Sequence, residues 1–245
     1  MIRTCFAKRI GVPSDKIFSV SAMPCTAKKF EATRAELGRR DDPDIDVVIT
    51  FRELFRMIRL YGIDFSALRP EPPDTPFATR SSAGKIFASA GGVAEAVLRT
   101  AYKMFTGHNL KSLKIDSLRG MDGIKDVHIP FGGYSVSAAA ANGLGNARKL
   151  LEQIRNGEHP ELQFVEVMAC PGGCIGGGGF PVVSAEKIKA RMQTIYQTDQ
   201  SSALRTAHDN PDVLRFYREF LGGEPGSPEA QSLLHTSFFK RDVYI

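Results

Sequence analysis

The feature that most constrains this chain is a glycine-rich loop that carries two cysteines. In VEVMACPGGCIGGGGFP, residues 165–181, Cys170 and Cys174 lie among six glycines, directly behind an apolar stretch that predicts a strand over residues 162–168. Thiolates are soft ligands that suit iron–sulfur clusters, zinc or copper. Glycines let the backbone approach a bulky inorganic group and supply amide hydrogens to it. We therefore predict a metal-binding loop rather than a turn with two inert buried thiols.

Composition narrows the class of protein and of partner. The 245 residues are 42% hydrophobic and 24% charged, as in ordinary soluble globular proteins, and no apolar run approaches the roughly 20 residues that span a bilayer. The start of the chain lacks the apolar core of a secretory signal, so we expect a reducing compartment, in which four cysteines favour metal or redox chemistry over disulfides. The net charge of +5 suits an acidic partner. The basic residues are scattered, so we do not expect nucleic-acid binding.

Apolar periodicity predicts alternating strands and helices, and therefore an α/β fold. The predicted strands are residues 17–23, 46–50, 113–115, 127–131, 134–141 and 162–168, and the main predicted helices are residues 51–62, 91–106 and 145–157. Open α/β sheets bind ligands beyond the carboxyl ends of their strands. Cys25 and Cys170 follow two such ends, so cysteine loops that face one cleft would form a metal pocket.

The segment around Cys25 adds two ionisable residues. In SAMPCTAKKFEATR, Lys28 and Glu31 follow Cys25 at the start of a predicted helix. A lysine beside a metal site can donate hydrogen bonds to anionic ligands, and a glutamate can relay protons. Taken alone, the two residues are better explained as an ordinary solvated charge pair at a helix start.

Read together, the two cysteine segments resemble a known family. MPCTAKKFE (residues 23–31) and EVMACPGGCIGGGGFP (residues 166–181) resemble two of the three signature stretches of the iron-only (FeFe) hydrogenases. The resemblance continues through GGVAEAVLRTAY, GLGNARKLLEQI, FYREFLGGEP and LLHT. It implies a two-lobed α/β catalytic domain, with sheets flanked by helices and the cluster site in the cleft between the lobes. Residues 1–186 would form that cluster-binding domain without its amino-terminal part, and residues 187–245 a helical tail that resembles the hydrogenase small subunit.

The resemblance also implies the cofactor and its protein ligands. In the family, a 4Fe–4S cubane is bridged through one cysteine sulfur to a di-iron centre that carries carbon monoxide, cyanide and a bridging dithiolate. Cys25 and Cys170 match cubane ligands, and Cys174 matches the bridging thiolate. The implied reaction is the reversible combination of protons and electrons into dihydrogen, an oxidoreductase activity for which the cofactor supplies the chemistry.

Five further residues match positions around that cofactor. Lys28 matches the lysine that hydrogen-bonds a cyanide, and Glu31 matches a carboxylate on the proton route. Met23 and Met168 match methionines that pack against the di-iron unit. Phe87, in GKIFASAGG, matches an aromatic residue of the pocket wall.

The chain departs from the family at its first signature. A T-S-C-C-P-type stretch, which supplies the fourth cubane ligand and a proton-passing thiol, does not occur here. Cys5 has no neighbouring cysteine and no following proline, so we predict that it is a packing residue. Ala88 and Ala90 stand where the family usually has glycine and a hydroxyl residue. We therefore expect little hydrogen turnover from this chain alone, as a fragment, half of a split enzyme or an altered descendant.

Two other classes of protein compete with a hydrogenase. One is a non-catalytic iron–sulfur protein of the same superfamily, acting as a sensor or an iron–sulfur assembly factor. The other is a zinc domain, which the isolated histidines do not favour. A plain cubane carrier needs neither Lys28 and Glu31 nor the two methionines, so their presence favours hydrogenase ancestry. The partners implied are a ferredoxin or other iron–sulfur electron carrier and hydrogenase maturation proteins, in the cytoplasm or in a reducing organelle such as a hydrogenosome.

Overall fold

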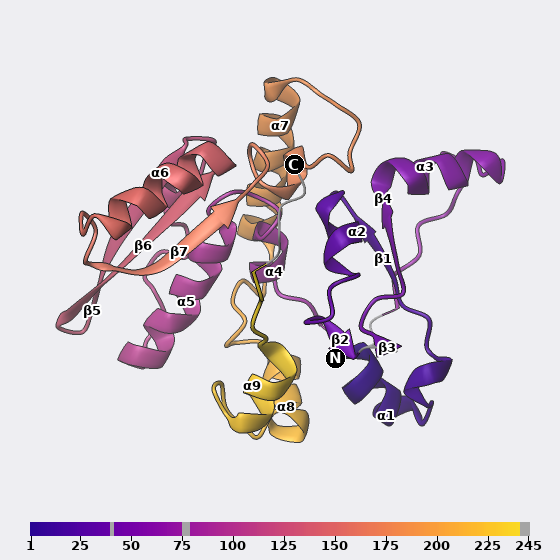
Figure 1. Cartoon of the computed structure of the whole chain (residues 1–245), viewed down its shortest axis with the longest axis horizontal. Coiled ribbons are helices and arrows are strands. Elements are labelled where there is room, and N and C mark those ends of the chain that lie inside the picture. Colours follow the sequence, from indigo (N-terminus) through magenta and orange to yellow (C-terminus); the bar gives the residue numbers. More distant parts are fainter. Residues whose placement is uncertain (40–41, 75–78, 241–245) are drawn as a thin grey trace. The chain divides into compact units, whose positions relative to one another are not determined.

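The computed structural model describes residues 1–39, 42–74 and 79–240, and the chain divides into two compact units (Figure 1). Unit 1 comprises residues 1–78 and 211–245, and unit 2 comprises residues 79–210. Both units contain strands and helices, which confirms the predicted α/β class. The predicted domain boundary at residue 186 rests on the family resemblance and not on this division into two units, and it stays a prediction.

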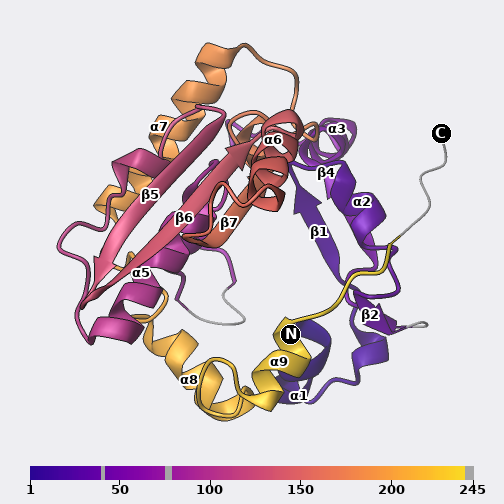
Figure 2. The ribbon, with the colours of Figure 1, turned by 60° about the vertical axis from the view of Figure 1, so that its left-hand side comes forward.

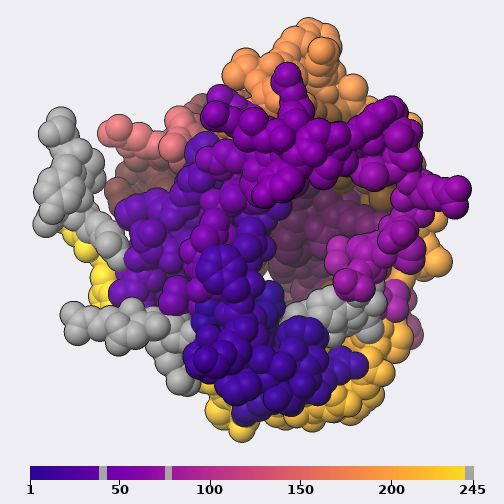
Figure 3. All heavy atoms as spheres, turned by 90° about the vertical axis from the view of Figure 1, so that its right-hand side faces the viewer, coloured from indigo at the N-terminus to yellow at the C-terminus, as the bar shows by residue number. Residues whose placement is uncertain are grey.

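Unit 1 is built around a short parallel strand pair. Its elements are η1 (Ile2–Phe6), α1 (Ala7–Ile10), η2 (Ser14–Lys16), β1 (Val20–Met23), α2 (Ala27–Glu31), β2 (Gly38–Arg39), β3 (Asp42–Pro43), β4 (Val47–Thr50), α3 (Phe51–Leu60), α8 (Pro211–Phe220) and α9 (Pro228–Leu234). Strands β1 and β4 pair in parallel, with Val20 opposite Val47 and Met23 opposite Thr50. In the space-filling view the first segments of this unit, in indigo and purple, lie packed side by side (Figure 3).

Strand β1 is shorter than the predicted strand over residues 17–23. The N–H of Ser19 donates to the Asp46 carboxylate at 2.6 Å, and Asp46 also accepts from Arg3 at 2.6 Å. A side chain therefore takes the backbone donor that would otherwise extend the ladder. The arrangement fixes the start of β1 against the start of β4.

Helix α3 begins at a capping box. The Thr50 hydroxyl accepts from the N–H of Glu53, and the Glu53 carboxylate accepts from the N–H of Thr50 at 2.7 Å. Hydrogen bonds from the Thr50 backbone, the Lys29 ammonium and the Thr50 hydroxyl lower the pKa of Glu53 to about 2. The proline-rich residues 70–74, farther along the chain, form no helix or strand.

Unit 2 is a three-stranded sheet between two helices. Its elements are α4 (Ala83–Ile86), α5 (Gly92–Thr106), η3 (Asp116–Leu118), β5 (Ile124–Phe131), β6 (Tyr134–Asn142), α6 (Leu144–Arg155), β7 (Leu162–Met168), η4 (Cys174–Gly176) and α7 (Ala185–Ser201). The strand order is β5-β6-β7, with β5 antiparallel and β7 parallel to the central β6.

Alternating alanines let helices cover both faces of β6. Ala138 and Ala140 pack with Leu98 of α5, while Ala139 and Ala141 pack with Leu150 of α6. Figure 2 shows α5 and α6 on opposite faces of the sheet. The small alanine side chains let both helices approach the sheet closely. Cys170 lies just beyond the carboxyl end of β7, which runs parallel to β6. None of the described helices is both long enough and apolar enough to cross a bilayer.

The predicted strand at residues 113–115 is wrong. This segment is irregular because side chains rather than a strand satisfy its backbone. The carbonyl of Leu113 accepts from Arg99 at 2.7 Å, and the N–H of Ile115 donates to Glu95 at 3.4 Å. An apolar run in the sequence does not reveal such side-chain partners.

A buried ion network ties α5 to α7. Arg99, which is fully buried, contacts Glu95 at 2.7 Å and Asp199 at 2.8 Å. Arg119 contacts Glu95 at 2.7 Å, and Arg205 contacts Asp199 at 2.9 Å. Each carboxylate thus has more than one guanidinium partner, which offsets the cost of burying the charges.

Asp199→Asn should lower the free energy of unfolding by about 3–5 kcal/mol, because it removes one charge from a buried ionic network. Urea unfolding at neutral pH measures the loss. Glu152→Gln is the matched control, since its ion pair with Arg148 is solvent-exposed and should contribute less than about 1 kcal/mol. A loss in Asp199→Asn no larger than that of the control would contradict the network's role.

The effect of Asp199→Asn should also depend on pH. Burial alone would raise the pKa of Asp199, but hydrogen bonds from Arg99, Arg205 and Ser82 outweigh burial and hold the pKa well below its ordinary value. Because the folded pKa is the lower one, the stabilisation is complete above the ordinary aspartate pKa of about 4 and is lost as the pH falls below it. The difference in stability between wild type and variant should therefore shrink in acid, and a constant difference would contradict this account.

Candidate metal-cluster site

The loop between Cys170 and Cys174 is a tight turn without side chains at its centre. The N–H of Gly173 donates to the carbonyl of Cys170 at 3.0 Å. Gly172 and Gly173 have φ values of 78° and 93°, in the left-handed region that favours glycine. A Cβ on Gly173 would lie 2.7 Å from the nitrogen of Ala90. Both positions therefore require glycine, and both cysteines remain half-buried rather than enclosed.

The turn is joined by backbone hydrogen bonds to the segment that precedes α5. The N–H of Ala90 donates to the carbonyl of Gly172 at 3.0 Å, and the N–H of Ile175 donates to the carbonyl of Ala88 at 3.1 Å. Ile175, which follows Cys174, is buried against Met192. The loop is thus anchored on both sides of its turn.

Two side chains also hold the loop. The Asn142 oxygen accepts from the N–H of Gly172 at 3.0 Å, and Arg191 donates to the carbonyl of Ile175 at 2.8 Å. The Arg191 guanidinium stacks over the Phe180 ring, 4.5 Å from its centroid. The sequence does not predict the role of Asn142 or Arg191, because no local pattern distinguishes either residue.

The start of α5 is fastened to the sheet by a buried carboxylate. Glu166 of β7 is 5% exposed and accepts from the N–H of Gly91 at 2.6 Å and from that of Ala94 at 2.7 Å. Lys125 of β5 donates to the carbonyl of Ala90 at 3.0 Å, and burial lowers its pKa. A negative charge at a helix start is favourable. The sequence signal that we missed is Glu166 itself, a charge in the middle of an apolar strand.

Met168 and Phe87 lie on the two segments that meet at the loop. Met168 is the last residue of β7, is half-buried, and its carbonyl accepts from the N–H of Gly143 at 2.7 Å. Phe87 follows α4 and is 44% exposed. Cys170, Cys174, Met168 and Phe87 thus all belong to unit 2. Their predicted roles toward a cofactor stay predictions.

Unit 1 places three predicted residues around one cavity of about 230 Å³. Met23, Lys28 and Glu31 line it together with Ser21 and Asp44. Met23 ends β1, and the other two lie on α2, so the strand–helix turn that contains Cys25 brings them together.

Lys28 and Glu31 form an ion pair in this cavity. The Lys28 ammonium lies 2.6 Å from both carboxylate oxygens of Glu31. Both side chains are 42% exposed. Exposed pairs contribute little to stability, so the pair is not needed to hold the helix. It can donate and accept protons at the cavity wall.

The four cysteines fall into two groups. Cys25 is half-buried, as are Cys170 and Cys174, whereas Cys5 is 3% exposed. No disulfide joins any of them. The buried position of Cys5 agrees with a packing role, and the three thiols that we predict as metal ligands are the half-buried ones.

The cysteine thiols are donor groups of the kind that bind iron–sulfur clusters. The cysteine loop offers two half-buried thiols, the donors that iron–sulfur clusters take, whereas the space that a Cβ on Gly173 would fill is occupied by the protein's own backbone. Within residues 1–39, 42–74 and 79–240, no group of three or more Cys, His, Asp or Glu is close enough to hold a metal ion. Cys25 belongs to unit 1 and the other two thiols to unit 2, so the three-thiol site stays a prediction.

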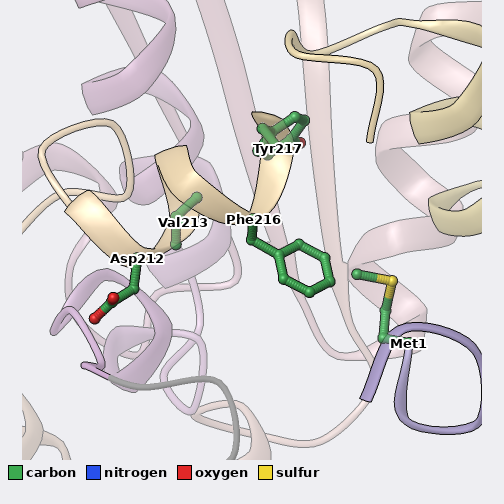
Figure 4. A pocket seen from close by; sticks show the side chains of 5 residues that line it. All are labelled: Met1, Asp212, Val213, Phe216 and Tyr217. Atoms are coloured by element: carbon green, nitrogen blue, oxygen red, sulfur yellow. The ribbon is translucent and has the colours of Figure 1, made fainter. Parts of the chain in front are cut away.

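A second cavity in unit 1 lacks this chemistry. It measures about 240 Å³ and is lined by Met1, Asp212, Val213, Phe216 and Tyr217. Figure 4 shows the Phe216 ring directed toward the Met1 side chain. The carboxylate of Asp212 accepts from Arg215 at 2.6 Å. The cavity contains none of the predicted site residues.

Comparison with known proteins places these features in a family. A family model described as "Iron only hydrogenase large subunit, C-terminal domain" matches residues 1–178, and one described as "Iron hydrogenase small subunit" matches residues 185–241. The chain is 44% identical over 241 residues to the NADP-reducing hydrogenase subunit HndD of Solidesulfovibrio fructosivorans, covering 98% of this chain and 41% of that protein.

Two further matches are an iron–sulfur assembly protein and a solved hydrogenase structure. The cytosolic iron–sulfur assembly component 3 of Bos taurus is 30% identical over 246 residues, covering 97% of this chain and 51% of that protein. A solved structure of apo FeFe-hydrogenase HydA1 from Chlamydomonas reinhardtii superposes with a TM-score of 0.79 at 36% identity, covering 97% of this chain and 66% of that one. The chain therefore spans about half of these two curated relatives or less. With its matched domain, its fold and its cysteine loop, the chain belongs to the iron-only hydrogenase family.

Proposed function

We propose that the chain is the cluster-binding part of an iron-only hydrogenase catalytic domain. Cys25 and Cys170 would ligate a 4Fe–4S cubane, and Cys174 would bridge it to a di-iron centre. The observation that carries the proposal is the loop at the end of β7, where two half-buried thiols flank a glycine turn anchored on both sides. Bound there, the di-iron centre would supply the reversible combination of protons and electrons into dihydrogen.

The protein's own residues would position the centre and move protons. Met23, Met168 and Phe87 supply apolar surface that excludes water from a bound group. Lys28 would donate hydrogen bonds to an anionic ligand of the centre. Glu31, paired with Lys28 at 2.6 Å, would pass protons between the cavity and the centre.

The proposal includes partners of defined chemistry. Electrons would come from an iron–sulfur carrier, and the net charge of +5 favours an acidic one such as a ferredoxin. Hydrogenase maturation proteins would deliver the di-iron unit. Four cysteines without disulfides fit a reducing compartment, either the cytoplasm or an organelle such as a hydrogenosome.

A second candidate function is iron–sulfur cluster assembly without hydrogen chemistry. The similarity to cytosolic iron–sulfur assembly component 3 over 97% of this chain favours it. The cavity lined by Met23, Lys28 and Glu31 favours the hydrogenase, because a carrier of a plain cubane needs no proton-handling pair beside it.

Cys25→Ser, Cys170→Ser and Cys174→Ser should each reduce the iron held after anaerobic reconstitution with ferrous iron and sulfide, because each removes a thiolate ligand. Cys5→Ser is the matched control and should bind iron like the wild type, since Cys5 is buried in packing. Iron and sulfide analysis with absorption spectroscopy measures the effect. Wild-type iron content in all three ligand variants would contradict the proposed ligand set.

Maturation of the longer parent protein should produce infrared bands from carbon monoxide and cyanide bound to iron. Such bands distinguish a hydrogenase from an assembly factor, since a plain cubane carries neither ligand. A matured protein that holds a cubane but shows no such bands would leave the assembly function as the better proposal.

Glu31→Gln in that matured protein should reduce hydrogen turnover by about 10²–10⁴-fold, because the amide cannot relay a proton. Glu53→Gln is the control: its ion pair with Lys29 at 2.9 Å has similar exposure but lies outside the cavity lining. Turnover is measured by gas chromatography with a reduced electron donor. Equal rates in the Glu31 and Glu53 variants would exclude Glu31 from the proton route.

A further inference from the structure

The amide of Gly172 is a buried donor whose partner is a side chain. Gly172 is buried, and its N–H donates to the Asn142 oxygen at 3.0 Å. Hydrogen bonds at the carbonyls of Cys170, Gly172 and Ala88 join backbone to backbone. Asn142, by contrast, is a side-chain partner of the turn that a substitution can remove without changing the loop itself.

The orientation of the Asn142 amide is set by a second contact. Its Nδ2 donates to the carbonyl of Met121 at 3.0 Å, so the nitrogen cannot face Gly172 without bringing its oxygen toward that carbonyl. The N–H of Asn142 donates to the carbonyl of Gly123 at 2.7 Å. Asn142 is 7% exposed and lies opposite Met168 in the β6–β7 ladder. The side chain is held rigidly at the strand end from which the cysteine loop departs.

A loop with consecutive glycines needs such a restraint. Gly172 and Gly173 have more backbone freedom than any other residue type, and the relative direction of the two cysteines depends on their torsion angles. A hydrogen bond to Gly172 selects one conformation before any metal is present. Contacts that orient metal ligands typically influence metal affinity by about 10–100-fold.

We propose that Asn142 is a positioning residue for the cysteine loop, and that its oxygen on the Gly172 N–H holds Cys170 and Cys174 in the ligand-binding conformation. Its relevance to metal binding rests on the proposed function, whereas its hold on the loop is a property of the protein without metal. Asn142 would act through the loop backbone and would touch neither iron nor substrate.

The test compares Asn142→Leu and Asn142→Ala, which remove the acceptor, with Asn142→Asp, which keeps an oxygen for Gly172. Asn210→Leu is the matched control. Asn210 is 1% exposed in the same unit, and its amide donates to the carbonyl of Thr79 at 2.8 Å, away from the cysteine loop. Asn210→Leu therefore shows how far the loss of a buried asparagine changes the stability of the protein when the cysteine loop is not touched.

The first measurement is thiol labelling of the metal-free full-length chain, resolved by peptide mass spectrometry. The acceptor-free variants should label Cys170 and Cys174 about tenfold faster or more, because a buried donor left unpaired releases the turn. Asn142→Asp and Asn210→Leu should label near the wild-type rate. Wild-type labelling in both acceptor-free variants, or equally fast labelling in Asn210→Leu, would overturn the proposal. If one acceptor-free variant fails to fold, the other decides.

The second measurement is iron loss to a chelator after anaerobic reconstitution with ferrous iron and sulfide. The acceptor-free variants should lose iron about 10–100-fold faster than wild type. If the wild type holds no iron, the proposed function fails while thiol labelling still decides the role of Asn142. Iron loss at the wild-type rate, despite faster labelling, would overturn the link to metal binding.

Discussion

Two hydrogen bonds, from the N–H of Ala90 to the carbonyl of Gly172 and from the N–H of Ile175 to the carbonyl of Ala88, join the cysteine loop to the segment before α5. The backbones approach so closely that a Cβ on Gly173 would overlap this segment. The end of β7 and the start of α5 are therefore held together by these contacts. Because the flexible glycine backbone is fixed in this way, the two thiols have a defined direction.

Two groups of charged residues differ in their burial. Arg99 and Asp199 are fully buried and have several partners, so their network fixes where α5 and α7 meet. Lys28 and Glu31 are 42% exposed and line a cavity. An exposed pair contributes little to folding. The first network thus stabilises unit 2, while the second pair is the one that we propose to handle protons.

Much of this arrangement follows from the sequence, and the rest depends on contacts between distant segments. Apolar residues predict β4, β6 and β7 closely, since they dominate each of these strands. The cysteine spacing predicts the turn. Asn142 and Glu166 escape prediction because their partners lie 30 or more residues away, in backbone amides that carry no sequence signal. The strand predicted at residues 113–115 is wrong for a related reason: the side chains of Arg99 and Glu95, on a different element, satisfy its backbone.

In the proposed site, sulfurs from separate parts of the chain hold one inorganic core. Anomalous diffraction at the iron edge, from crystals of the anaerobically reconstituted chain, locates the iron and its ligands. We expect a single iron cluster bonded to the Sγ atoms of Cys25, Cys170 and Cys174. Iron bonded to Cys170 and Cys174 with Cys25 turned elsewhere, or iron at separate sites, would contradict it.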